Sequence, residues 1–188
     1  MIIRYVLPLS LLLATGPVWA ADAPYAGLQH RPIKALSSQE IGDLRAGRGM
    51  GMALAAELNN YPGPRHVLDL SDQLGLSPDQ KSRVSALFGE MAARAQALGA
   101  QILDAEARLD RSFAAGQTDE TALRSMTADI AGLNGELRYV HLRYHLVVRD
   151  LLSTDQIARY NALRGYGSAE DGKRPAHGRH GGAHGGHR

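Results

Sequence analysis

The chain is organised around Leu76-Ser77-Pro78-Asp79-Gln80, which opens its longest helical pattern. An altered copy of this stretch, Leu152-Ser153-Thr154-Asp155-Gln156, stands where that pattern ends. In each copy the serine is expected to be the N-cap residue, whose side chain accepts a hydrogen bond from the backbone N–H three residues on. The glutamine can reach back to the backbone N–H of the serine, which completes a capping box. The two copies therefore predict two helix starts.

A third, looser copy lies upstream at Leu36-Ser37-Ser38-Gln39-Glu40. It predicts a helix from Ser37 to about Asn59, although three glycines between positions 47 and 51 interrupt the pattern, each at a cost of about 1 kcal/mol relative to alanine. The prolines and glycine of residues 60–64 then break the chain. A short helix is predicted from His66 to about Leu74, with Gly75 as its C-terminal cap.

Two long segments after Gly75 carry helical apolar rows. Between Pro78 and about Ala115 the rows are Val84, Met91, Leu98 and Ala105, and Phe88, Ala95, Ile102 and Leu109. After a short turn, in which Thr118 or Asp119 can cap the next helix, the row is Leu123, Met126, Ile130, Leu133, Leu137, Val140, Tyr144, Val147 and Leu151. This spacing is typical of a helical seam. Two helices of roughly 50 Å joined by so short a loop are expected to be antiparallel neighbours.

The predicted fold class is therefore all-α, an elongated antiparallel helical hairpin with flanking shorter helices. Residues 1–20 read as a secretion signal cleaved near Ala20, because an arginine precedes a short apolar run and a small-residue site. Residues 21–36 are expected to be an extended arm, and residues 37–164 the helical domain. Its last helix should run from Ser153 to about Leu163 and end at Gly165. Residues 165–188 are rich in glycine and histidine and are expected to be disordered.

The composition of the chain excludes several classes of function. The formal net charge is only +2, so no basic footprint for nucleic acid is expected. The chain has no cysteine, which excludes disulfides, thiolate metal sites and a nucleophilic thiol. The apolar run of the signal is too short to span a membrane, and no later segment is long enough. Since no phosphate loop or catalytic grouping stands out, we expect an exported protein that is neither an enzyme nor embedded in the membrane.

The paired boxes resemble the Leu-Thr-x-x-Gln boxes of the Spy/CpxP family of periplasmic proteins. The resemblance runs from about Leu68 to Arg164 and includes the continuation of the second box as Ile157-Ala158-Arg159-Tyr160-Asn161. Serine replaces threonine in both boxes, Thr154 stands where proline is common, and residues 21–65 are longer than expected for the family. The resemblance implies a cradle-shaped, antiparallel homodimer in the periplasm that binds unfolded or aggregation-prone client proteins without ATP. Related members bind zinc, sense nickel or cobalt, or restrain an envelope sensor kinase.

Two groups of histidines are candidate metal ligands. His141 and His145 stand four residues apart on the second long helix, so both imidazoles can face the same way. The tail adds four histidines at spacings of three, four and three: His177, His180, His184 and His187. Neutral imidazoles bind Zn(II), Cu(II) or Ni(II). The alternative reading of the helix pair is structural, with both rings bonded across the dimer seam or to water. Met50 and Met52 could bind Cu(I), but packing is the reading we favour.

The leading expectation is thus a periplasmic, ATP-independent chaperone or envelope-stress adaptor that needs no cofactor. The alternative is a periplasmic metal-binding or metal-sensing protein. Regulation of a sensor kinase is a third role, which no sequence feature supports directly. The boxes are explained by helix capping alone, and periodicity does not assign the face that meets a client.

Overall fold

The computed structural model describes residues 23–166, and within this range every regular element is helical. A short 3₁₀ helix, η1 (Leu28–His30), precedes the α-helices. These are α1 (Ser38–Arg45), α2 (Leu54–Glu57), α3 (Pro64–Asp69), α4 (Pro78–Ala114), α5 (Glu120–Leu151) and α6 (Thr154–Arg164). The predicted all-α class is confirmed. The predicted signal segment and residues 167–188 of the predicted tail lie outside the described residues. Residues 165 and 166 of that tail are not disordered as predicted, since Gly165 ends α6 and the hydroxyl group of Tyr166 bonds to Glu57.

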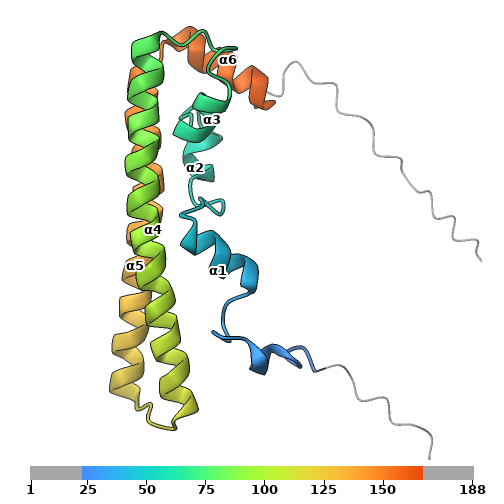
Figure 1. Cartoon of the computed structure of the whole chain (residues 1–188), viewed down its shortest axis with the longest axis vertical. Coiled ribbons are helices and arrows are strands. Elements are labelled where there is room, and N and C mark those ends of the chain that lie inside the picture. The colour runs from blue at the N-terminus through green and yellow to red at the C-terminus, as the bar shows by residue number, and fades with distance from the viewer. Residues whose placement is uncertain (1–22, 167–188) are drawn as a thin grey trace, which may run out of the picture.

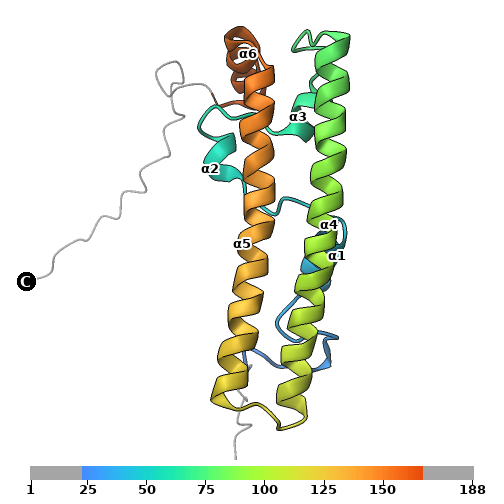
Figure 2. The same ribbon diagram turned by 90° about the vertical axis from the view of Figure 1, so that its left-hand side faces the viewer.

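Helices α4 and α5 form the predicted antiparallel hairpin (Figures 1 and 2). They contain 37 and 32 residues, so at 1.5 Å per residue they are about 55 and 48 Å long. Asp119 caps α5 by accepting a hydrogen bond from the backbone N–H of Ala122 at 2.7 Å. We call the end where α4 begins and α5 ends the hairpin base. The hairpin tip is the opposite end, residues 106–130.

All three predicted capping boxes are present. The side chains of Ser37, Ser77 and Ser153 accept hydrogen bonds from the backbone N–H of Glu40, Gln80 and Gln156. Each of these last residues bonds back to the N–H of its serine. The boxes therefore fix the starts of α1, α4 and α6, as capping physics predicts.

The two boxes of the hairpin also bond to each other, which their sequences do not reveal. The amide of Gln80 donates to Oε1 of Gln156 at 3.0 Å, and the amide of Gln156 donates to Oε1 of Gln80 at 3.1 Å. Gln80 donates in addition to the carbonyl oxygen of Leu151 at 2.8 Å. The caps of α4 and α6 thus form one polar clamp that closes the hairpin base.

Short helices cover one side of the hairpin from its base to just past its middle. Figure 1 shows α1, α2 and α3 in a row beside α4 and α5, with α6 lying across the end of the hairpin. The core beneath α3 and α6 contains Val67, Leu74, Val84, Val148, Leu152 and Tyr160. Further along, Leu44 of α1 packs with Ala95, Ile102 and Leu137. The hairpin core is therefore three layers deep only where these short helices cover it.

A glycine allows α1 to pack directly against α4. A Cβ on Gly99 would lie 2.1 Å from the carbonyl oxygen of Leu44, so no side chain fits at this position. Gly47, which follows α1, has a φ of +62°, and a Cβ there would lie 3.0 Å from the backbone nitrogen of Gln96 and 3.1 Å from the carbonyl oxygen of Ala92 on α4. These contacts place the backbone after α1 against the hairpin.

The predicted helix from Ser37 to about Asn59 is wrong as a single element. Helix α1 ends at Arg45, and α2 begins only at Leu54. Residues 46–53, which we call the glycine loop, contain positive φ angles at Gly47, Met50 and Gly51. Left-handed backbone ends a helix. The three glycines were visible in the sequence, but they end the predicted helix instead of only lowering its stability.

Two other element boundaries need correction. Helix α3 begins at Pro64 rather than His66 and ends at Asp69 rather than near Leu74. Gly75 has a positive φ of 63° but lies in the turn that follows, so Leu70 is the C-cap residue of α3. The end of α6 at Gly165 in the left-handed conformation is as predicted.

The arm is less extended than predicted. It contains η1, its Ile33 is buried, and Lys34 forms an ion pair of 2.9 Å with Asp110 of α4. Residues 21 and 22 of the arm lie outside the described range. Between residues 23 and 166 no helix combines the length and apolar character that crossing a membrane requires.

Candidate functional site

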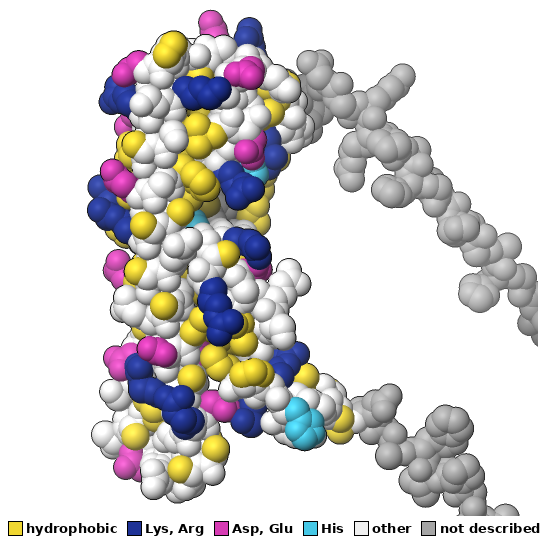
Figure 3. Space-filling view, viewed as in Figure 1, with side chains coloured by type: hydrophobic (Ala, Val, Ile, Leu, Met, Phe, Trp, Pro, Cys, Tyr) yellow, Lys and Arg dark blue, Asp and Glu magenta, His cyan; other side chains and the backbone are white. Residues whose placement is uncertain are grey.

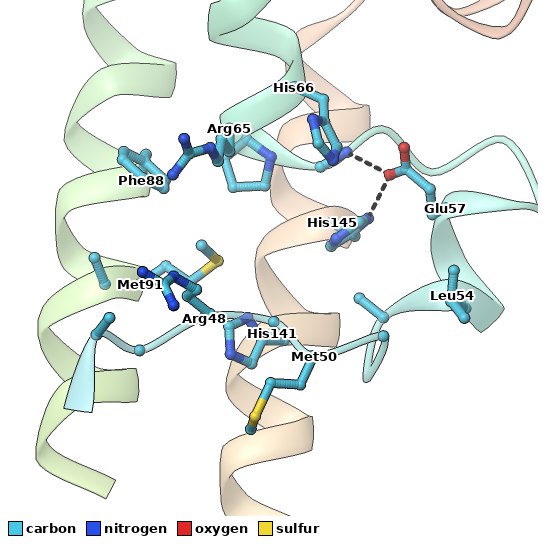
Figure 4. Close-up of a pocket in the computed structure, with 18 of the residues that line it drawn as sticks. Arg48, Met50, Leu54, Glu57, Arg65, His66, Phe88, Met91, His141 and His145 are labelled. Atoms are coloured by element: carbon cyan, nitrogen blue, oxygen red, sulfur yellow. Dashed lines mark hydrogen bonds and ion pairs between the residues drawn. The ribbon is translucent and has the colours of Figure 1, made fainter. Parts of the chain in front are cut away.

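A cavity of about 500 Å³ lies between the glycine loop, α3 and the base half of the hairpin. The glycine loop contributes Arg48 and Met50, and α4 contributes Phe88, Met91 and Ala92. Figure 4 shows Arg48 and Arg65 reaching toward Met91 and Phe88 from opposite sides. The remaining side chains that matter for its chemistry are Leu54, Glu57, His66, His141, His145, Arg164 and Tyr166. The cavity therefore combines an apolar wall with titratable groups.

Glu57 is the buried centre of a polar cluster beside this cavity. Its Oε1 accepts hydrogen bonds from the hydroxyl groups of Tyr160 and Tyr166 and lies 3.5 Å from Nε of Arg164. Its Oε2 accepts a hydrogen bond of 3.2 Å from the backbone N–H of Gly63. Burial and the bond to Glu57 together raise the pKa of Tyr160. The cluster joins α2, α3 and α6, so its first role is structural.

His145 uses one of its two ring nitrogens in a hydrogen bond within the chain. Its Nδ1 lies 2.7 Å from the carbonyl oxygen of Tyr61, so Nδ1 carries the proton and donates it. The same nitrogen is 3.7 Å from Oε2 of Glu57, a contact drawn in Figure 4. Gly63 packs against the ring, since a Cβ there would lie 2.8 Å from Cε1. The imidazole ring of His145 is therefore buried and links α5 to the segment before α3 through a hydrogen bond and packing.

His141 is buried beneath the glycine loop, and in the part of the chain that the structure describes its Nε2 has no hydrogen-bond partner. A Cβ on Gly49 would lie 3.7 Å from its Nδ1, so the loop lies directly over the ring. Burial, with a smaller contribution from His145, lowers the pKa of His141. The imidazole is accordingly neutral near pH 7, with an unused polar atom inside the protein.

The two helix histidines do not form a metal site with their described neighbours. Among residues 23–166 no group of three or more histidine, aspartate or glutamate side chains is arranged to hold a metal ion. His145 has its hydrogen-bond partner, the carbonyl oxygen of Tyr61, in the same chain rather than across a dimer seam, whereas Nε2 of His141 has no partner among the described residues. His177, His180, His184 and His187 lie outside the described residues. Met50 is exposed on the glycine loop, and Met52 packs against the core around Leu44.

Sequence reasoning missed Glu57, Tyr160 and Arg164 as a cluster. Glu57 is the only charged residue between Gly49 and Pro64, and a lone carboxylate in so apolar a stretch was the available signal. Its partners lie about a hundred residues away on α6, where no local pattern marks them. His66 lines the cavity near the start of α3, and burial lowers its pKa.

The hairpin tip is a second candidate site, because its seam is only partly covered. At the base half the α5 row is buried at Leu137, Val140 and Tyr144. Toward the tip Leu123, Met126 and Ile130 are only half-buried. Phe113 of α4 is 58% exposed. Figure 3 shows apolar, basic and acidic side chains intermixed over this lower end of the molecule.

Comparisons with protein-family models, curated proteins and solved structures gave no match to this chain.

Proposed function

We propose that this protein is an exported, ATP-independent chaperone or stress adaptor that captures unfolded segments of other proteins in the periplasm. The observation that carries the proposal is the partly covered apolar seam at the hairpin tip. Half-buried apolar side chains that continue a helical seam are typical of surfaces that meet a partner. The resemblance of the paired boxes to the Spy/CpxP family supports the same role.

The chemistry of the tip suits weak, reversible capture. Half-covered side chains such as Leu123, Met126 and Ile130 leave only part of their surface for a client, so each contact contributes modestly to binding. Exposed arginines flank them, at Arg108 and Arg111 of α4 and Arg124 of α5. Such charges accelerate encounter with acidic or partly unfolded chains more than they increase affinity. A client is thus met quickly and released readily.

The proposal includes dimerisation. Among residues 23–166 no third helix packs against the tip, and a second copy is one partner that would cover part of its apolar row. Sedimentation equilibrium of the processed chain at micromolar concentration measures this directly. A single species at the monomer mass would remove the dimer from the proposal and leave client capture standing.

An aggregation assay tests the function. Heat-denatured citrate synthase should remain in solution when the protein is present at equal molar concentration, without ATP. The variant Phe113→Ser with Met126→Gln should suppress aggregation less, because it removes apolar surface from the tip. Leu163→Ser is the matched control, since Leu163 is 44% exposed on α6 far from the tip.

Two results would contradict client capture by the tip. The first is no suppression of aggregation by the unmodified protein at equal concentration. The second is an equal loss of suppression in the tip variant and in the Leu163→Ser control. The second result would place the client surface elsewhere on the molecule.

A further inference from the structure

The cavity under the glycine loop has the size of a small-molecule site. Its volume of about 500 Å³ lies within the range of roughly 300–1,000 Å³ that ligand pockets occupy. One wall is apolar and comes from two elements, with Phe88, Met91 and Ala92 on α4 and Met50 on the glycine loop. Such a wall fits a flexible hydrocarbon body, because methionine side chains adapt to irregular apolar shapes.

The charges that line the cavity favour an anion. Three arginines and one carboxylate line it, and the carboxylate of Glu57 is already bonded to Arg164, Tyr160 and Gly63. The two arginines that remain, Arg48 and Arg65, come from opposite sides and are largely exposed at their tips. Their carboxylate partners, Asp43 and Asp69, do not line the cavity. The lining therefore carries a net charge of two positives when its histidines are neutral.

His141 provides a second, independent observation that points to a ligand in the cavity. The side chain is buried and lines the cavity, yet its Nε2 has no hydrogen-bond partner within residues 23–166. Buried polar atoms without a partner are rare and destabilising. This nitrogen exposes less than 1 Å² to solvent, so the polar head of a ligand supplies the missing hydrogen bond only when the glycine loop moves to admit it.

We propose that this cavity binds a small amphipathic monocarboxylate, of the medium-chain fatty acid class, with its chain against Phe88 and Met91. The carboxylate head lies between Arg48 and Arg65, where a guanidinium group can hold a carboxylate through two parallel hydrogen bonds. The polar end of the ligand is within the part of the cavity that His141 also lines. The site lies on the base half of the hairpin and is separate from the tip.

Isothermal titration calorimetry with three ligands tests the chemistry. Decanoate should bind, decanol should bind about tenfold more weakly because it lacks the charge, and acetate should not bind because it lacks the chain. The probes are used with the full processed chain at pH 7.5. Equal affinity for decanol and decanoate would overturn the anionic part of the proposal, and acetate binding as tight as decanoate would overturn the apolar part.

Variants tie the binding to this cavity. Arg48→Gln with Arg65→Gln should weaken decanoate binding about tenfold, whereas Arg83→Gln should leave it unchanged. Arg83 is the matched control because it is an exposed arginine of α4 outside the cavity, paired with Asp79. Ala92→Phe should abolish binding by filling the cavity, provided that its circular dichroism and melting midpoint match the unmodified protein. Unchanged affinity in the double arginine variant would refute the site even if the Ala92 variant fails to fold.

Ligand binding and client capture can fail separately. The double arginine variant retains Phe113 and Met126, so it should still suppress aggregation. If decanoate does not bind, the client proposal is unaffected. If aggregation is not suppressed, the calorimetry still tests decanoate binding independently.

Discussion

The base half and the tip of the hairpin share the same apolar spacing in sequence but differ in how deeply their apolar side chains are buried. In both, apolar residues step by three and four along α5. Val140 and Tyr144 of the base half are buried, whereas Met126 and Ile130 of the tip are half-buried. The difference comes from the helices that pack on the outside, since α1, α2 and α3 cover the hairpin from its base to about Ile102 and stop short of the tip (Figure 1). The apolar spacing of a helix specifies which residues face the neighbouring helix. Whether these residues become fully buried depends on a further layer of helices packed over them.

The two halves also differ in polar contacts. The base half holds the clamp of Gln80 and Gln156, the cluster around Glu57 and the bond of His145 to Tyr61. At the tip the polar contacts are short-range or exposed, such as the pair of Ser112 and Thr118. We therefore expect substitutions at the base to unfold the protein and those at the tip to change its surface behaviour.

The largest effect is expected from Glu57→Ala. It removes the carboxylate that joins α2, α3 and α6 and leaves the buried ends of Tyr160 and Arg164 without their partner. The free energy of unfolding should fall by about 3 kcal/mol, as for other buried charge pairs that lose one member. Urea unfolding followed by circular dichroism measures this.

Glu57→Gln is the matched control for that substitution. It keeps the length of the side chain and an oxygen that can accept the Tyr160 hydrogen bond, so its loss should be smaller. Equal destabilisation by alanine and glutamine would mean that charge alone matters. A loss below about 1 kcal/mol with alanine would show that the cluster does not hold the base together.

The next largest effect is expected from Gly99→Ala. The new methyl group would collide with the backbone of Leu44, so α1 must move away from α4. The unfolding free energy should fall by about 2 kcal/mol, within the usual range for overpacking. The same measurement applies, with proteolysis in the segment between α1 and α2 as a local readout.

Gly132→Ala, on the uncovered part of α5 next to the tip, provides the comparison. Nothing lies within 4 Å of a Cβ at Gly132. There alanine should stabilise the helix by about 0.5–1 kcal/mol, because it lowers the backbone entropy of the unfolded chain. Destabilisation at Gly132 would show that this face is covered in solution and would favour the dimer.

A smaller effect is expected from Gln80→Ala. This change removes the reciprocal amide pair with Gln156, the bond to the Leu151 carbonyl and half of one capping box. The melting midpoint should fall by an amount that corresponds to about 1–2 kcal/mol. Glu40→Ala is the control, because its box has no partner box and should cost less. Equal losses at Gln80 and Glu40 would mean that the clamp adds nothing to the caps.

The smallest effect is expected from pH. The pKa of His141 is lowered by burial, with His145 as a secondary cause. The charged side chains that line the same cavity are Glu57, Arg48, Arg65 and Arg164. The unfolded chain, with a histidine pKa of about 6.5, then binds the proton more readily than the folded chain. Stability is fully present above that pKa and falls as the pH decreases toward the folded-state pKa.

Melting midpoints between pH 7.5 and pH 5.5 check this dependence. The midpoint should decrease at the acidic end, and His141→Gln should flatten the decrease because the titrating ring is gone. His66, whose pKa is lowered chiefly by burial, contributes in the same direction. An identical pH dependence in His141→Gln would assign the effect to other groups.

Local features were predictable because their causes are local. The three capping boxes, the cap at Asp119, the end of α6 at Gly165 and the antiparallel hairpin all follow from residues within a few positions of one another. The errors arose where local signals conflict. The three glycines near Met50 end α1 instead of weakening a longer helix, and Pro64 starts α3 earlier than the apolar pattern suggests.

The sequence by itself therefore determined the all-α class, the hairpin and its helix starts, since backbone capping and apolar periodicity act over short distances. Only the tertiary structure decided that the two glutamines of the boxes bond to each other. It also decided that Glu57 meets Tyr160 across a hundred residues, and that the glycine loop covers His141 above a cavity. These contacts depend on how three layers of helices pack, and no pattern along one helix records its neighbours in space.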